Sequence, residues 1–127
     1  MMSEYKYRLA IAKTEDGVGI GIERIKAGSG DIDDVNYIAS IYVDERLSNR
    51  EIMIRAVNEV LAIAGDEESV SIRVSAGNNV FAKWSLRNVN KQFPNVKLFK
   101  TENFIRSATK LAEDAIKRKT TITENLK

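Results

Sequence analysis

The chain begins with an alternating stretch, Tyr5-Lys-Tyr-Arg-Leu-Ala-Ile-Ala12, which leads through Lys13-Thr-Glu-Asp-Gly17 into Val18-Gly-Ile-Gly-Ile22. Large apolar side chains occupy every second position of the first part, as in a strand with one buried face. The pair Asp16-Gly17 tolerates the positive φ angles of a tight hairpin turn. The stretch therefore predicts two antiparallel strands joined by a short turn.

A third strand and a capped helix are expected next. Val35–Val43 is rich in β-branched and aromatic residues and follows a polar loop, Gly28–Asp34. Ser48 and Glu51 have the Ser-x-x-Glu spacing of a capping box, in which each side chain bonds the other residue's free backbone N–H. Apolar residues then recur at intervals of three and four up to Gly65, which predicts a helix that ends there.

The second half of the chain predicts strands that alternate with helices. The segments are a strand over Val70–Val74, a turn over Ser75–Asn79, a helix from about Val80 to Phe93 that Pro94 stops, a strand over Val96–Phe99, and a helix with apolar residues from Phe104 to Ile116.

The resulting order, β-β-β-α-β-α-β-α, predicts an α/β domain with a mixed five-stranded sheet and helices on both faces. We expect one domain over residues 1–119 and a frayed C-terminal tail over 120–127.

Composition narrows the possible functions. The 127 residues include neither cysteine nor histidine, which excludes disulfides, thiolate metal sites, histidine general bases and imidazole zinc sites. The start lacks the apolar run of a signal peptide, and no stretch has the length of a membrane span, so a cytoplasmic protein without membrane contact is expected. We expect no cofactor.

The charges are divided between the two halves of the chain. Residues 1–69 hold 8 Lys/Arg and 14 Asp/Glu, whereas residues 70–127 hold 12 and 4. Such a division either draws the halves together on folding or leaves a basic surface for a polyanion.

A basic row stands in the helix expected from about Val80. Lys83, Arg87 and Lys91 recur every four residues and therefore share one helix face, with Trp84 beside the first. The row suits nucleic-acid phosphates, and Trp84 suits stacking on a base. The alternatives are an ordinary solvated face and a Trp84 that belongs to the core.

Three segments resemble the ribonuclease H family. They are Gly17-Val-Gly-Ile-Gly-Ile22 in the second strand, Ser48-Asn49-Arg50 before the first helix, and Lys110-Leu-Ala-Glu-Asp-Ala115 in the last helix. The resemblance implies a ribonuclease H fold and, in active members, two-metal cleavage of RNA in hybrids. Two divalent ions need several carboxylates close together, because hard cations prefer oxygen ligands.

The positions that match the family's carboxylates hold other residues. They are Ala12, Lys13 or Thr14 on the first strand, Ile52 in the first helix, Ser75 or Ala76 after the fourth strand, and Thr109 in the last helix.

Nearby acids have simpler roles than metal binding. Asp16 belongs to the hairpin turn, Glu51 to the capping box, and Asp114 to a solvated helix face. We therefore predict no metal site and no catalytic residues.

Three functions follow from these observations. The first is a catalytically inactive ribonuclease H-like domain that binds RNA, DNA or a hybrid through its basic half, with Lys83, Trp84, Arg87 and Lys91 as contacts. The second is a protein-interaction or assembly module, such as a homodimer. The third is a diverged metal-dependent nuclease that uses displaced acids such as Asp16 and Glu51.

Overall fold

The computed structural model describes residues 5–26, 35–67, 69–75, 83–101 and 106–126. Within these ranges the strands and helices follow the expected order, with one further strand near the C-terminus. The elements are β1 (Tyr5–Thr14), β2 (Gly17–Lys26), β3 (Val35–Val43), α1 (Asn49–Ala64), β4 (Val70–Ser75), α2 (Lys83–Gln92), β5 (Val96–Thr101), α3 (Arg106–Arg118) and β6 (Ile122–Asn125).

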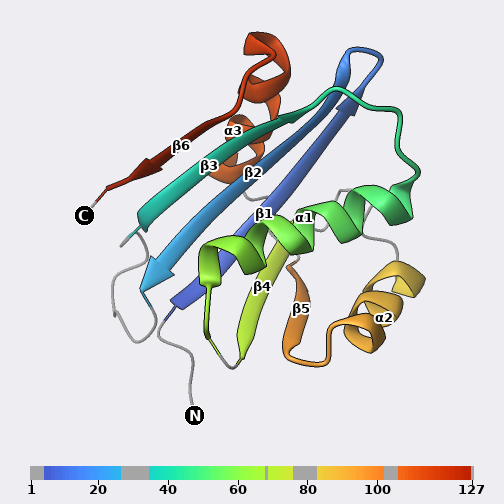
Figure 1. The fold of residues 1–127 in the computed structure, drawn as a ribbon, viewed down its shortest axis with the longest axis vertical. Coiled ribbons are helices and arrows are strands. Elements are labelled where there is room, and N and C mark those ends of the chain that lie inside the picture. The colour runs from blue at the N-terminus through green and yellow to red at the C-terminus, as the bar shows by residue number, and fades with distance from the viewer. Residues whose placement is uncertain (1–4, 27–34, 68, 76–82, 102–105, 127) are drawn as a thin grey trace.

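The strands of the described chain form one mixed sheet of six, in the order β5-β4-β1-β2-β3-β6 (Figure 1). The first three strands are an antiparallel meander. By contrast, β4 is parallel to β1 and β5 is parallel to β4. Helices α1 and α2 make the two crossovers that such parallel pairs require.

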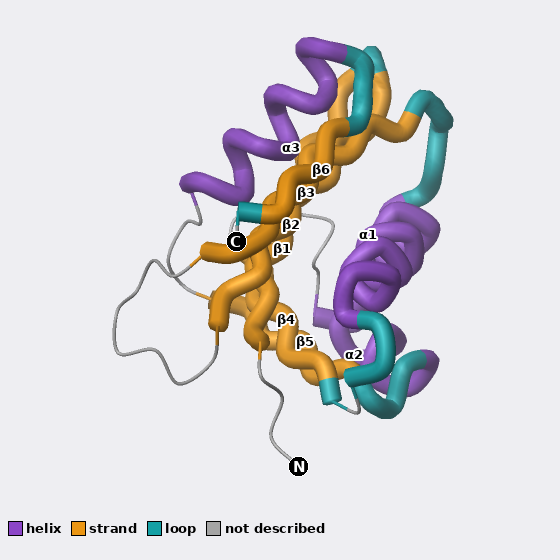
Figure 2. The backbone as a smooth tube through the Cα atoms, turned by 60° about the vertical axis from the view of Figure 1, so that its left-hand side comes forward, coloured by secondary structure: helices purple, strands orange, loops and turns teal. Residues whose placement is uncertain are grey.

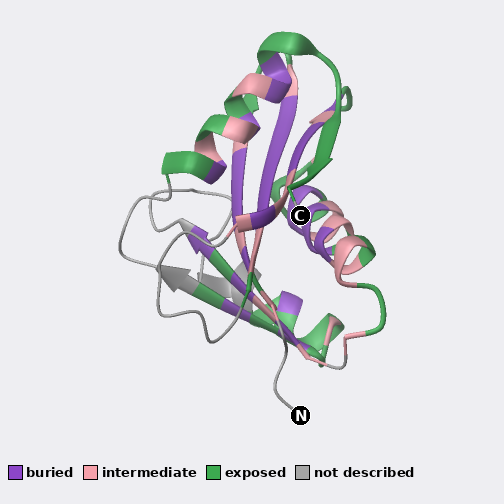
Figure 3. Cartoon of the chain, turned by 90° about the vertical axis from the view of Figure 1, so that its left-hand side faces the viewer, coloured by how far each residue is buried: buried purple, intermediate pink, exposed green. Residues whose placement is uncertain are grey.

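The sheet separates the helices into two layers. Figure 2 shows α1 and α2 against one face and α3 against the other. The main core lies on the α1 side, where Tyr7, Leu9 and Ile11 of β1 join a buried cluster with Ile52 and Val57 of α1. The alternation seen at the start of the sequence thus points every second side chain of β1 toward this helix. Figure 3 shows the central strands buried for most of their length.

Two glycines bring α3 close to the sheet. A Cβ atom on Gly19 would overlap the carbonyl oxygen of Ala112, and one on Gly21 would overlap that of Ala108. Both alanines are fully buried. Small residues on strand and helix therefore allow backbone to approach backbone along this face.

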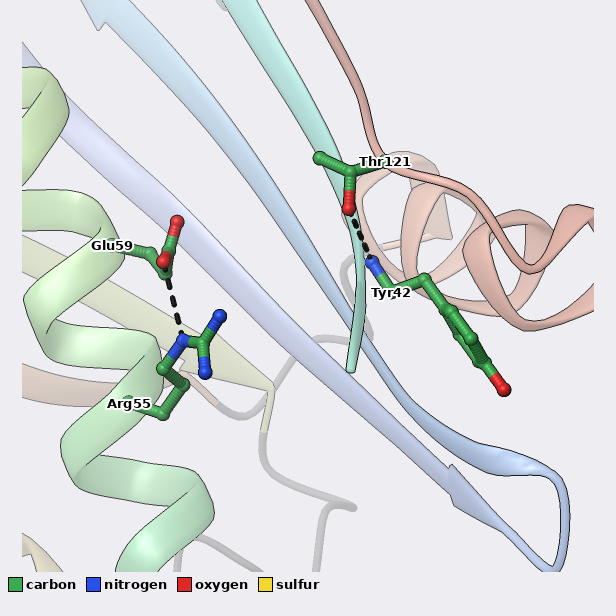
Figure 4. A network of polar contacts seen from close by, with 4 residues as sticks. All are labelled: Tyr42, Arg55, Glu59 and Thr121. Atoms are coloured by element: carbon green, nitrogen blue, oxygen red, sulfur yellow. Dashed lines mark hydrogen bonds and ion pairs between the residues drawn. The ribbon is translucent and has the colours of Figure 1, made fainter. Parts of the chain in front are cut away.

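The predicted capping box at the start of α1 is present. The Ser48 hydroxyl accepts a bond from the Glu51 N–H, and the Glu51 carboxylate accepts one from the Ser48 N–H at 3.0 Å. Gly65 ends the helix with a φ of 65°. On the helix surface, Arg55 donates to Glu59 at 3.2 Å, one turn along (Figure 4).

The C-terminal segment corrects the sequence prediction. Residues 122–125, expected to fray, form β6 and pair antiparallel with β3, so the sheet has six strands rather than five. The Tyr42 N–H donates to the Thr121 hydroxyl at 3.0 Å (Figure 4), and the Leu126 N–H donates to the Asn36 carbonyl at 2.9 Å. All four β6 residues are exposed, so the strand leaves no pattern of alternating apolar and polar residues in the sequence.

Several expected segments fall outside the described residues. These are the loop expected over 28–34, residues 76–79 of the expected turn, residues 80–82 before α2, and Phe104 and Ile105 before α3. Among the described helices, none has both the length and the apolar character that crossing a membrane requires.

Candidate nucleic-acid interface

All four residues predicted to contact nucleic acid belong to α2. Arg87 and Lys91 are exposed one turn apart, and Val89 between them is 3% exposed. Two helical residues turn the side-chain direction by about 200°, so a buried Val89 directs its two neighbours away from the core. Lys83 and Trp84 form the first turn of α2, but their side chains lie outside the described part of the structure.

The surroundings of α2 in the sequence are uniformly basic. No acidic residue occurs between Glu68 and Glu102, a span that contains β4, α2 and β5. Six basic residues occur in the same span: Arg73, Lys83, Arg87, Lys91, Lys97 and Lys100. Since β5 and β4 are the outer strands at one side of the sheet, this positive charge is concentrated at that side.

Some positions that match the family's carboxylates can be placed in the structure. Ile52 is completely buried in the core, and Ala12 and Thr109 are half-buried. Lys13 is exposed, and its ammonium group donates to the Asn49 side chain at 3.3 Å, which joins the end of β1 to the start of α1. The Ser75 side chain and Ala76 lie outside the described part of the chain.

The backbone of Asp16 and the carboxylate of Glu51 make structural contacts. The Asp16 backbone N–H donates to the Thr14 hydroxyl at 3.1 Å, and the Asp16 carbonyl accepts a bond from the Tyr42 hydroxyl at 2.6 Å. Hydrogen bonds from the backbone and side chain of Ser48 lower the pKa of Glu51. Among the described residues, no three acids gather closely enough to hold a metal ion.

A tyrosine and a buried carboxylate complete the polar interior. Burial and the hydrogen bond from the Tyr7 hydroxyl to Glu67, 2.6 Å long, raise the pKa of Tyr7, so its phenol stays protonated. On the α3 side, Glu23 is buried between Arg8, at 3.5 Å, and the Ser107 hydroxyl, at 2.8 Å. These groups join elements of the fold to one another.

A second basic surface, which was not predicted from the sequence, lies on the sheet itself. Arg73 of β4 and Lys97 and Phe99 of β5 are exposed, and half of the Phe99 surface is accessible. The signal that could have found them is the alternation of charged or aromatic residues with apolar ones in both short strands. Their proximity depends on the pairing of strands about 25 residues apart, which no local pattern specifies.

No family model and no curated protein matches this sequence. Among solved structures, the ribonuclease H1 of the halophilic archaeon Halobacterium salinarum NRC-1 is similar, with a TM-score of 0.56 at 13% identity. The match covers 90% of this chain and 98% of that one. The likeness establishes the fold: the chain has a ribonuclease H-like α/β fold with a mixed sheet, as the sequence resemblance implied.

Proposed function

We propose that the chain is a non-catalytic ribonuclease H-like domain that binds nucleic acid through its basic half. The observation that carries the proposal is the pair Arg87 and Lys91, exposed on one face of α2 within a span free of acidic residues. Lys83 extends the same row by one turn. Cations spaced along a helix neutralise successive phosphates, and this sequence-independent attraction supplies most non-specific affinity for nucleic acid.

The proposed absence of catalysis rests on the residues at the family's metal-binding positions. Ile52 is part of the hydrophobic core, and an ionised carboxylate there would lose its hydration without a partner. The nearest acid in α1, Glu51, is engaged with Ser48 at the helix start. A two-metal mechanism requires several free carboxylates at one place, so binding without cleavage suits this chain better.

Charge reversal on α2 tests the proposal. The double variant Lys83→Glu with Arg87→Glu should weaken binding of a labelled RNA–DNA hybrid by about tenfold or more in a fluorescence anisotropy titration. The slope of log affinity against log salt concentration should also become less steep by about two, because each cation that no longer neutralises a phosphate reduces the slope by about one.

A matched control has the same change in net charge on the opposite layer. Lys110 and Lys117 are both exposed on α3. The variant Lys110→Glu with Lys117→Glu should therefore lower the affinity less than the α2 variant does, and should change the slope against salt concentration less. If the α2 variant binds as the wild type does, the row is not the interface.

A second candidate function is an assembly module, and β6 is the observation that favours it. This strand lies at the edge of the sheet, and Ile122 and the adjacent Leu126 are 46% and 44% exposed. An exposed edge strand can pair with another chain. Sedimentation velocity across salt concentrations tests this candidate: a dimer at micromolar concentration supports it, and a monomer at every salt concentration contradicts it.

A further inference from the structure

On one face of β4, β5 and the start of β1, the side chains are basic and aromatic, and none of the described helices packs against β4 or β5 there. Val70, Ile72 and Val74 of β4 belong to the core cluster on the α1 side. Successive strand residues point to opposite faces, so Arg73 points to the α3 side of the sheet. Helix α3 itself packs on β1, β2 and β3, and in the described structure it leaves Arg73 exposed.

Buried and exposed side chains alternate in the same way on the neighbouring strands. In β5, Val96 and Leu98 are buried in the core while Lys97 and Phe99 are exposed. In β1, Lys6 is exposed between core residues. The outward side chains of all three strands therefore share one surface, which we call the sheet face and define as Lys6, Ser71, Arg73, Lys97 and Phe99.

Strand pairing aligns these residues in two rows. Lys6 is opposite Ser71, which is opposite Lys97. In the next row Arg73 lies between Arg8 and Phe99. Rows two residues apart are separated by about 7 Å, so Arg73 and Lys97 are the same-face neighbours of Phe99 on a surface three strands wide.

The charges on this face leave a net positive surface. Arg8 is paired with Glu23 at 3.5 Å and is mostly buried, so it marks the boundary of the sheet face beside α3. Lys6, Arg73 and Lys97 are exposed, and β4 and β5 carry no acidic residue. An exposed phenylalanine with cationic neighbours suits a ligand that is both aromatic and anionic.

We propose that the sheet face binds single-stranded nucleic acid, with a base stacked on Phe99 and phosphates beside Lys97, Arg73 and Lys6. This inference rests on the proposed function and names its substrate class. Aromatic side chains on open sheets stack unpaired bases, and neighbouring cations follow the backbone. A paired duplex keeps its bases stacked on one another and offers Phe99 no base face, so the exposed ring commits this surface to single strands.

The sheet face adjoins the α2 row. Edge strand β5 carries Lys97 and Phe99 on one side and packs against α2 on the other. A single strand that crosses this edge reaches both surfaces, whereas a duplex reaches only the cations of α2. The two surfaces therefore predict different responses to the same probes.

The test compares a labelled single-stranded oligothymidylate with a blunt DNA duplex by fluorescence anisotropy. Phe99→Ala should weaken binding of the single strand by about tenfold, since loss of one stacked base has an effect of this size. Phe99→Trp should restore it. Duplex affinity should change by less than about twofold in either Phe99 variant. The charge reversal Arg73→Glu with Lys97→Glu should weaken binding of the single strand more than Phe99→Ala does.

The outcomes separate this inference from the proposed function. If Phe99→Ala and the charge reversal bind oligothymidylate as the wild type does, while the α2 variant loses affinity, the sheet face is not a binding site and the proposed function stands. If the wild type binds neither probe at low salt, both proposals fail. Phe99 is exposed, so unchanged urea unfolding of Phe99→Ala checks that weaker binding reflects the missing ring and not a less stable fold.

Discussion

Gly19 and Gly21 determine how closely α3 lies on the sheet. Each occupies a β2 position whose outward direction meets a carbonyl of α3, so even a methyl group has no room there. In the sequence, these glycines are part of the segment that resembles the ribonuclease H family. The structure gives them a steric reason, because backbone carbonyls cannot move aside without displacing the helix.

Gly19→Ala should lower the free energy of unfolding by about 2 to 3 kcal/mol, because the added carbon overpacks the contact with Ala112. Urea denaturation measures this loss. Gly19 is not at a positive φ, so the overlap with Ala112 accounts for the expected loss. A loss below about 0.5 kcal/mol, as for an ordinary surface substitution, would show that α3 is not held at this distance.

Glu51 makes the start of α1 sensitive to pH. Its pKa is lower in the folded chain than its ordinary value of 4.5, because Ser48 donates a backbone hydrogen bond to the carboxylate. Because the pKa is lowered in the folded chain, the ionised Glu51 carboxylate stabilises the fold fully at pH values above the ordinary pKa. This stabilisation is lost as the pH falls below 4.5 and through the folded pKa, where both states are protonated.

Comparison with Glu51→Gln, which stays neutral, isolates this contribution. Wild type should exceed the variant in unfolding free energy at pH 7, and the difference should shrink toward pH 3. Chemical denaturation at both pH values makes the comparison. A difference that is the same at pH 3 and pH 7 would mean that the Glu51 charge does not support the helix start.

Strand β6 depends on its pairing with β3. It has four exposed residues and is held to β3 by backbone pairing and by the flanking bonds from Tyr42 to Thr121 and from Leu126 to Asn36. A net contribution near 1 kcal/mol for each of a few hydrogen bonds makes this strand a modest stabiliser.

Removal of residues 121–127 should lower the free energy of unfolding by about 2 kcal/mol and increase amide exchange along β3. Hydrogen exchange followed by mass spectrometry measures the second effect. Strands β4 and β5, at the other side of the sheet, provide the internal reference. Unchanged exchange in β3 would contradict the pairing.

The elements differ in how well the sequence predicts them. The Ser48–Glu51 spacing located the start of α1, and the alternation from Tyr5 to Ile11 identified β1 and its buried face. These features are local, so a short window contains them. In contrast, β6 has no buried side chain to impose a pattern, and its place beside β3 arises from contacts more than 80 residues apart.

For the whole molecule, the division of charge in the sequence becomes a division in space. Strands β4 and β5 and helix α2 come from the span without acids and lie together at one side of the sheet (Figure 1). The sequence located the α2 row because Lys83, Arg87 and Lys91 share a helical period. It could not locate the sheet face, since Lys6 and Lys97 come together only through the parallel register.

The proposed function requires that the chain bind nucleic acid without cleaving it, and one titration measures both properties. A labelled RNA–DNA hybrid is titrated with the wild-type chain at about 50 and 200 mM salt in the presence of Mn²⁺, and the products are separated on a gel. Three phosphate contacts predict saturable binding that weakens by about 40-fold between the two salt concentrations, with the hybrid intact. Absence of binding at the lower salt concentration, or cut hybrid on the gel, would contradict the account.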